Sequence, residues 1–301
     1  MHSLLRPALA VGLTTALGLF GCAPLPHAEA DSNPETVPEA PPKPPIYETV
    51  SLPAATVHVV TIPDPVRYPV RVAVVEELAR VEAIAAQVCG AIGCVAAINA
   101  GFFDPNNGLT TSYVVQDGVL VADPSQNERL VGNPDLTSYM DRILNRSEFR
   151  RYDCDGTSSY DITFHSDPVP AGCALVDAVG AGPQLLPQDT SVEEGFVDPA
   201  VNRDALGSQS ANARSAVGLT ADGSVVMVMA AQVPGVSPSG LTMAEMAGLM
   251  GDRGVVKALN LDGGSSSTLL YQGTTYFGRL NASGELVQRP VKSILWVENT
   301  P

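Results

Sequence analysis

The segment from residue 258 to residue 269 combines a carboxylate with groups that bind anions. Its amide and carboxylate alternate with leucines at the end of an apolar run, ALNLD, so both polar side chains are expected on one face of a strand. Two glycines and three serines follow, and their unobstructed amides and hydroxyls are typical of an anion-binding loop. The loop is not a P-loop, because no lysine follows the glycines. The candidate residues are Asn260, Asp262, Gly263, Gly264, Ser265 and Ser266.

A single arginine is the candidate partner for an anion. Arg214 is the only basic residue between Arg203 and Arg253, and it stands at the entrance of an apolar run in an acidic chain. A guanidinium presents a planar fork that binds a phosphate or a carboxylate through two hydrogen bonds. We therefore predict that Arg214 binds the anion; the alternative is a structural ion pair.

Two further segments place glycines or polar groups at the end of an apolar run. Residues 94–99 lead into an amide, a glycine and two adjacent aromatics, which could present an amide and a ring face to a ligand or could form a turn that fills the core. The sequence Gly-Ala-Gly at 180–182 permits close approach of the backbone, or forms a plain tight turn. The candidate residues are Asn99, Gly101, Phe102, Phe103 and Gly182.

Two short helices are predicted to support these segments. Apolar residues recur at helical spacing over 75–88, with charged residues on the opposite face. Thr242 and Glu245 have the spacing of a capping box, which predicts a second helix through Met250. Each helix precedes an apolar run, at 94–99 and at 255–262, that is typical of a buried central strand.

The rest of the chain has the pattern of antiparallel β structure. Apolar or alternating stretches that contain a central turn predict hairpins at 112–122, 215–230, 267–277 and 279–298. The expected fold class is α+β, with a mixed, mainly antiparallel β-sheet and a few helices. We expect one folded domain over residues 46–301.

Charge and histidine content exclude several classes of function. The chain has 301 residues, and its 17 basic and 32 acidic residues give a formal charge of -15, so a nucleic-acid partner bound through a basic face is not expected. Only His58 and His165 fall within the predicted domain, which excludes a multi-histidine zinc site. The chain also contains no G-x-S-x-G sequence, which argues against a serine hydrolase with a nucleophile at such a turn.

The N-terminal residues predict export and a lipid anchor. Arg6 precedes an apolar run at 8–20, which is too short to span a bilayer, and the run ends in the bacterial lipobox-like sequence LFGC. We expect a lipoprotein signal peptide over 1–21 and lipidation of Cys22; ordinary signal-peptide cleavage is the alternative. Residues 22–45 are proline-rich and are expected to form an extended tether. The expected location is the bacterial cell envelope, on the periplasmic or extracellular face.

The remaining cysteines agree with an oxidising compartment. Four are left once Cys22 is assigned to lipid, and an exported domain would pair them. Loop closure is easiest over short separations, so the predicted disulfides are Cys89–Cys94 and Cys154–Cys173. Zinc ligation is the alternative, and the absence of C-x2-C spacing argues against it. No metal or other cofactor is expected; the alternative is a calcium-dependent activity.

Four segments together resemble the phosphodiester glycosidase family. They are NAGFF at 99–103, GAGPQLL at 180–186, ARSAVG at 213–218 and LNLDGGSSSTL at 259–269, and they occur in the expected order. The resemblance spans roughly residues 50–298, and this chain is similar to the cyanobacterial envelope proteins of the family.

The resemblance implies hydrolysis of a sugar-1-phosphodiester at its glycosidic bond, which yields a free sugar and a phosphomonoester. An envelope or exopolysaccharide carbohydrate would be the substrate, Asp262 the carboxylate and Arg214 the phosphate ligand. Glycosidic mechanisms normally use a second carboxyl group, for which Asp104 is the candidate. Two alternatives use the same residues: a non-catalytic glycan-binding lipoprotein, and a calcium-dependent phosphodiesterase with Asp262, Asn260 and serine oxygens as ligands.

Overall fold

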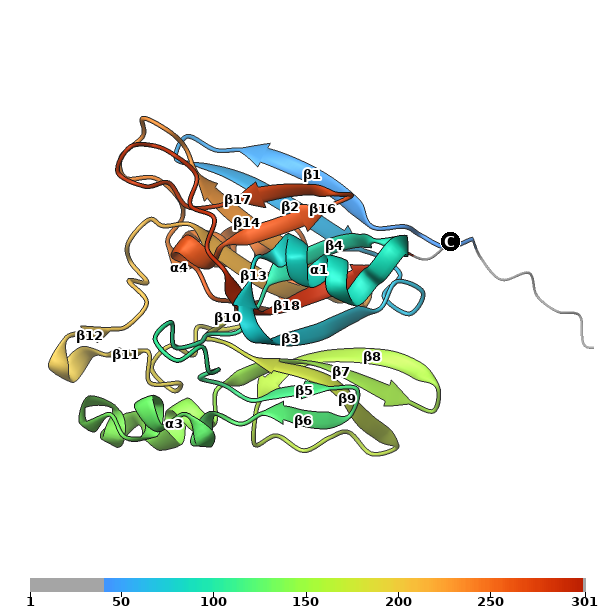
Figure 1. Cartoon of the computed structure of the whole chain (residues 1–301), viewed down its shortest axis with the longest axis horizontal. Helices are drawn as coiled ribbons and strands as arrows, with labels where there is room; N and C mark the ends of the chain where they lie inside the picture. Colours follow the sequence, from blue (N-terminus) through green and yellow to red (C-terminus); the bar gives the residue numbers. More distant parts are fainter. Residues whose placement is uncertain (1–40, 300–301) are drawn as a thin grey trace, which may run out of the picture. The chain divides into compact units, whose positions relative to one another are not determined.

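The computed structural model describes residues 41–299 of the chain. The predicted signal peptide (1–21), the lipidation site Cys22 and the tether as far as residue 40 lie outside the described residues. Within residues 41–299, no helix has the length and apolar character needed to cross a membrane. Three β-sheets and a few short helices form this part of the chain (Figure 1).

The first sheet has six strands and carries two of the predicted motifs. Its strand order is β1-β2-β14-β13-β15-β10, so the strand of Arg214 lies beside the strand of Asn260. The hairpin predicted at 215–230 is confirmed as β13 and β14. The strands are β1 (Ile46–Ser51), β2 (Ala55–Ile62), β10 (Gln184–Leu186), β13 (Arg214–Thr220), β14 (Val225–Gln232) and β15 (Val255–Asn260).

The second sheet has five strands, in the order β17-β16-β4-β18-β3. Its central strand β4 is the buried strand expected at 94–99, and β16 and β17 form the hairpin expected at 267–277. The hairpin expected at 279–298 is confirmed only around its turn, where Leu280 pairs with Leu286; β18 pairs with β3 and β4 on its two sides and is not an arm of it. The strands are β3 (Val70–Ala79), β4 (Cys94–Asn99), β16 (Thr268–Tyr271), β17 (Thr274–Phe277) and β18 (Val291–Glu298).

The third sheet has five strands, in the order β6-β5-β9-β7-β8. The hairpin expected at 112–122 is confirmed as β5 and β6. A separate two-stranded ribbon joins β11 and β12. The strands are β5 (Val114–Gln116), β6 (Val119–Ala122), β7 (Ser147–Cys154), β8 (Thr157–Phe164), β9 (Cys173–Gly180), β11 (Val197–Asp198) and β12 (Arg203–Asp204). Every pairing between these named strands of residues 41–299 is antiparallel, so the α+β class is confirmed without the parallel pairs of a mixed sheet.

The helices are short, and the two longest cover the outer faces of the first two sheets. Helix α4 begins at Thr242 with the predicted capping box, whose side chains bond reciprocally with Glu245. Helix α1 starts later than expected, because residues 75–79 continue β3, which pairs with β18, and this strand outweighs their helical spacing. The helices are α1 (Val81–Cys89), α2 (Glu128–Val131), α3 (Met140–Leu144) and α4 (Met243–Gly251). Short 3-10 helices lie at Gly90–Ile92, Pro124–Gln126, Pro134–Tyr139, Pro199–Val201 and Gly264–Ser266.

The apolar core sits between the sheets and under the two longer helices. Alternate residues of β15 serve two layers: Leu259 packs into the central core with Ile98 and Leu295 of the second sheet, and Ala258 packs under α4. Helix α1 packs on the other face of the second sheet, around Trp296. The ends of β4 and β15 are therefore fixed from both sides, which gives the segments that follow them a rigid base.

Both predicted disulfides are confirmed. Cys89 is bonded to Cys94 and joins the end of α1 to the start of β4. Cys154 is bonded to Cys173, and these two residues face each other across β7 and β9.

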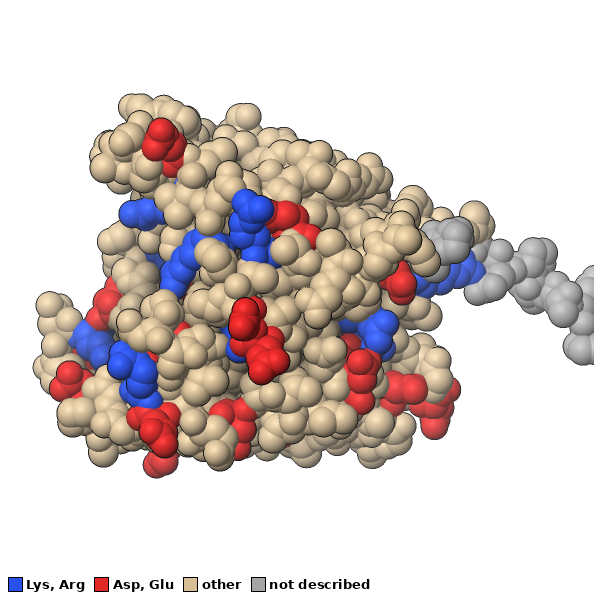
Figure 2. Space-filling view, viewed as in Figure 1, with Lys and Arg blue, Asp and Glu red and all other residues tan. Residues whose placement is uncertain are grey.

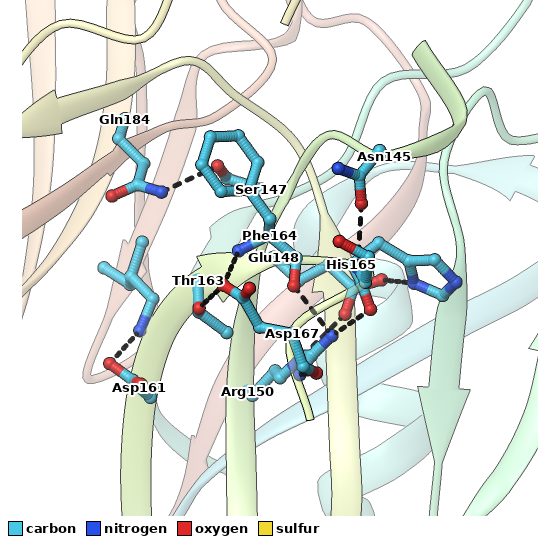
Figure 3. Close-up of polar contacts among 12 residues, drawn as sticks. Asn145, Ser147, Glu148, Arg150, Asp161, Thr163, Phe164, His165, Asp167 and Gln184 are labelled. Carbon is cyan, nitrogen blue, oxygen red and sulfur yellow. Dashed lines mark hydrogen bonds and ion pairs between the residues drawn. The ribbon is translucent and has the colours of Figure 1, made fainter. Parts of the chain in front are cut away.

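A buried polar cluster in the third sheet fixes the turn after β8 (Figure 3). Glu148 accepts hydrogen bonds from Arg150 Nε at 2.7 Å and shares one with His165 Nδ1 at 2.6 Å. The other guanidinium nitrogens of Arg150 donate to the carbonyls of Phe164, His165 and Asp167. Because its donors and acceptors are paired internally, this cluster serves the fold.

Candidate active site

The backbone brings the four segments of the sequence motifs together. Asp262 N donates to Ala100 O, and Gly264 N donates to Ala213 O. Asn260 O accepts from Gly182 N, which adds the glycine segment to the same place. We call the place where the four segments meet the junction. The site therefore lies where the ends of β4 and β15 meet, between the second and first sheets.

Asn99 positions the junction and has no exposed surface. Its Nδ2 donates to the backbone carbonyl of Asp262 at 2.6 Å. Its Oδ1 accepts from Ser215 Oγ at 2.8 Å and from Thr268 N at 3.0 Å. The sequence pointed to a ligand contact for this amide, but the structure uses it to hold the loop of Asp262 in place.

A cavity of about 520 Å³ opens above the junction. Asp262 is the one carboxylate among the described residues that line it. The wall opposite the junction is the loop that leads from β17 to β18. The lining residues are Phe102, Ala205, Leu206, Asn212, Arg214, Asn260, Asp262, Gly263, Gly264, Ser265, Arg279, Leu280, Asn281, Ala282 and Val287.

The pKa of the Asp262 carboxyl group is raised above its ordinary value. Burial raises its pKa to about 6, and the Ser266 hydroxyl, the Arg289 guanidinium and the Gly263 amide lower it by less. Ser266 was predicted to contact the substrate, but it is fully buried and does not line the cavity, so its hydroxyl acts on the Asp262 carboxylate instead. A carboxylate with this pKa can exchange a proton at physiological pH.

Arg214 lines the cavity, but its guanidinium is already occupied. Nε donates to Leu241 O at 3.1 Å and Nη1 to Leu206 O at 3.1 Å. Nη2 donates to Gly207 O at 2.6 Å and to Ser210 O at 2.9 Å. The bidentate phosphate contact predicted for Arg214 is therefore corrected: four backbone carbonyls take four of its five N–H donors, and the residue fixes the 206–210 loop.

Two other arginines supply positive charge at the site, and no sequence motif marked either one. Arg279 lines the cavity, and its Nη1 is hydrogen-bonded to Asn212 Oδ1. Arg289 donates from Nη1 to Ser265 Oγ at 3.0 Å and lies over the ring of Phe103, 5.0 Å from its centroid. On the face drawn in Figure 2, basic side chains gather below the loop that joins β17 and β18 in Figure 1.

The two phenylalanines have different roles. Phe102 lines the cavity, and its ring centroid lies 5.7 Å from that of Phe196. Phe103 is 8% exposed and belongs to the core under α1, as the alternative interpretation expected.

Asp104 is not brought to the cavity. Its carboxylate accepts from Arg129 Nε at 2.7 Å and from Asn106 N at 2.8 Å. The Asn106 amide and the Arg129 guanidinium outweigh desolvation and lower the pKa of Asp104. The prediction of Asp104 as a second catalytic carboxyl group is therefore corrected, because this carboxylate closes a local turn.

Close packing accounts for two of the predicted glycines. A Cβ atom at Gly101 would lie 2.6 Å from Gly180 O. Gly182 has a φ of +116°, and a Cβ atom there would collide with the carboxylate of Glu194. Both glycines are required for packing beside the site, and neither lines the cavity, whereas Gly263 and Gly264 do.

Glu194 is a second carboxyl group near the junction that the sequence did not mark. It is fully buried and accepts from Ser147 Oγ at 2.8 Å, Ser147 N at 3.1 Å and Gln184 N at 3.1 Å. Burial raises its pKa. Glu194 does not line the cavity, so its hydrogen bonds support β10 behind Asn260.

A comparison with protein families shows which family this chain belongs to. A sequence model described as phosphodiester glycosidase matches residues 92–298, which contain all four motif segments. The chain belongs to the phosphodiester glycosidase family. No curated protein matches the chain.

Solved structures share the fold of this chain. The catalytic domain of zebrafish N-acetylglucosamine-1-phosphodiester alpha-N-acetylglucosaminidase, auto-inhibited by its pro-peptide, is 19% identical with a TM-score of 0.63 over 85% of this chain and 82% of its own. A hypothetical protein from Synechocystis is 18% identical, with a TM-score of 0.54 over 84% of this chain and 61% of its own. A Burkholderia pseudomallei protein is 14% identical, with a TM-score of 0.57 over 81% of this chain and 74% of its own.

The arrangement of the site residues bears on the calcium-dependent alternative. Among residues 41–299, no group of three or more His, Cys, Asp and Glu side chains lies close enough to hold a metal ion. The predicted calcium ligands are Asp262, Asn260 and the serines, and Asn260 Nδ2 donates to Gly182 O at 2.8 Å. The calcium-dependent alternative therefore rests on a single carboxylate.

Proposed function

We propose that the protein hydrolyses a sugar-1-phosphodiester at the glycosidic bond. The observation that supports this reaction most directly is the composition of the cavity wall: one carboxylate, Asp262, faces arginine and neutral hydrogen-bonding groups among the described lining residues. A glycoside with a poor leaving group needs a second carboxylic acid to protonate it. A phosphodiester leaves as a stabilised phosphomonoester anion, so positive charge replaces that acid.

The proposed reaction gives roles to the carboxylate, to one arginine and to the glycine–serine loop of the cavity. Water adds to the anomeric carbon, the bond from that carbon to the phosphate oxygen breaks, and the phosphomonoester leaves. Asp262 acts in its ionised form, either as the nucleophile or as the base that takes the proton of water. Arg279 and the loop of Gly263, Gly264 and Ser265 bind the departing phosphate.

The substrate is proposed to be a carbohydrate of the envelope or an exopolysaccharide. This proposal depends on the lipobox-like LFGC sequence and the proline-rich tether, which would hold the domain beside an outer surface. Mass spectrometry of the mature protein tests the anchor: a first residue other than modified Cys22 contradicts it.

A panel of sugar-1-phosphodiesters tests the proposed reaction. The protein is expected to release free sugar from at least one of them, and Asp262→Asn is expected to abolish the release. Asp252→Asn is the matched control, since Asp252 is an exposed residue at the end of α4. Binding of the diesters without turnover by the unmodified protein would contradict the hydrolase and favour a glycan-binding protein.

A further inference from the structure

A second cavity, of about 760 Å³, lies between the second and third sheets. Its walls come mainly from β3, at the edge of the second sheet, and from the β5–β6 hairpin, at the edge of the third (Figure 1). Strand β5 lies beside β3, because Val74 N donates to Gln116 Oε1 at 3.4 Å and Arg71 Nη2 donates to Asp117 Oδ1 at 2.9 Å. The cavity shares no described lining residue with the active-site cavity, so the active site does not account for it.

A bulge in β3 places a lysine in this cavity. Residues 75–78 of β3 pair with no residue of β18, and Lys292 alone lies opposite them. The surplus residues bend β3 away from its partner, as bulges do beside binding sites. Lys292 lines the cavity at this point and is 7% exposed. The cavity therefore contains a buried cation.

The ammonium of Lys292 has unused donors. Nζ donates one hydrogen bond, to Glu76 O at 2.8 Å, and forms no ion pair with a carboxylate among residues 41–299. An ammonium has three N–H donors, so two remain for a ligand. Burial lowers the pKa of Lys292, and the negative charge of Glu76 raises it by less. A buried cation without a counter-ion is unfavourable, and an anionic ligand would supply the missing charge.

Most of the remaining wall is aliphatic. Three of its side chains keep large exposed fractions, 41% at Leu109, 60% at Val119 and 45% at Val121. Exposed apolar surface that surrounds a buried cation suits an amphiphile, whose chain would cover this surface. The aliphatic lining residues are Val74, Val75, Leu109, Val119, Val121 and Ala122.

The other polar groups of the lining favour a head group with a single negative charge. The carboxylates of Glu76 and Asp123 also line the cavity and would repel a dianion such as a phosphomonoester. Gln116 uses its Oε1 for Val74 N, so its Nε2 is a neutral donor for the head group. A carboxylate has one charge and two acceptor oxygens, which fits the donors of Lys292 and Gln116.

We propose that this cavity binds an aliphatic carboxylate. The carboxylate accepts hydrogen bonds from Lys292 Nζ and Gln116 Nε2, and the chain lies between β3 and β6. None of the residues given a role in the proposed hydrolysis takes part, so the site is independent of the proposed function.

Calorimetry with decanoate tests the site, on the whole protein at pH 7 and below the concentration at which decanoate forms micelles. Lys292→Met removes the ammonium and keeps an aliphatic side chain, and Lys43→Met is the matched control at an exposed lysine outside the cavity. We expect Lys292→Met to weaken decanoate binding about tenfold or more, with Lys43→Met changing it less than about twofold.

A second variant keeps the test valid if Lys292→Met does not fold. Val121→Asp changes an exposed residue of β6 and leaves the hydrogen bond of Lys292 intact. It is also expected to weaken decanoate binding about tenfold or more, because it puts a charge against the chain. No binding by the unmodified protein, or equal binding by the unmodified protein and the folded variants, overturns the proposal.

Two further probes with the same chain test the class of head group. Decyltrimethylammonium reverses the charge, and decyl phosphate is a dianion at pH 8. We expect both to bind about tenfold or more weakly than decanoate at that pH. Binding of either probe as tight as that of decanoate overturns the assignment of a carboxylate.

Discussion

The side-chain amide of Asn99 donates a hydrogen bond to the backbone carbonyl of Asp262, with a nitrogen–oxygen distance of 2.6 Å. Asn99 ends β4 of the second sheet, and Asp262 follows β15 of the first sheet. One buried side chain therefore ties the loop of the candidate catalytic carboxylate to a different sheet.

Replacement of Asn99 tests this tie. Asn99→Leu leaves Ser215 Oγ and Thr268 N without their acceptor, and each unsatisfied buried group costs about 1–3 kcal/mol. We expect the free energy of unfolding, measured with denaturant, to fall by about 2–5 kcal/mol. The exposed control Asn299→Leu is expected to change it by less than about 0.5 kcal/mol. Equal effects of the two substitutions would show that Asn99 does not hold the junction.

The two arginines of the cavity are expected to differ in what they support. Arg279→Gln removes the cation from the phosphate position and should lower kcat/KM about 10²- to 10³-fold, with little change in stability. Arg214→Met leaves four carbonyls without a donor and should lower the free energy of unfolding by several kcal/mol. Arg129→Gln, which is outside the cavity, is the control for both measurements. An Arg214→Met protein with normal stability and no activity would restore Arg214 as the phosphate ligand.

The stability of the protein should depend on the ionisation of Asp262. Its pKa rises from 3.8 to about 6 on folding, so the ionised carboxylate destabilises the folded state above the unfolded pKa. Two pKa units correspond to about 3 kcal/mol. Asp262→Asn should therefore raise Tm at pH 7.5, and the gain should shrink as pH falls from about 6 to about 4. A gain that is independent of pH would contradict the raised pKa.

Activity should show the same titration. Asp262 acts as a carboxylate in the proposed mechanism, so kcat/KM is expected to rise with pH through about 6 and then to level off. A pH series on a sugar-1-phosphodiester measures this limb. Activity that falls as pH rises through 6 would assign Asp262 as a proton donor instead.

The sequence was sufficient for the parts of the fold that depend on short-range patterns. The turn at Asp117-Gly118 predicted the β5–β6 hairpin, and Thr242 with Glu245 predicted the start of α4. Longer-range pairing was not visible: residues 75–79 have helical spacing, but they continue strand β3, which pairs with β18. The same strand is paired on both sides, so the hairpin expected at 279–298 forms only around its turn, where Leu280 pairs with Leu286.

The location of the site could be predicted from the sequence, but the roles of its residues could be predicted only in part. The motif segments do meet, because polar residues at the ends of buried strands converge when those strands pack together. The role of Arg214 depended on where four carbonyls lie, which no residue pattern encodes. Arg279 lies in a loop without a motif, so its place on the cavity wall required the fold.

Hydrolysis in water enriched in oxygen-18 tests the central claim most directly. Cleavage at the anomeric carbon places the heavy oxygen in the released sugar and leaves the phosphomonoester unlabelled. Attack at phosphorus, as in a calcium-dependent phosphodiesterase, places it in the phosphate. We expect mass spectrometry to find the label in the sugar alone, at a rate that Asp262→Asn abolishes and chelator leaves unchanged. Label in the phosphate would contradict the glycosidase mechanism.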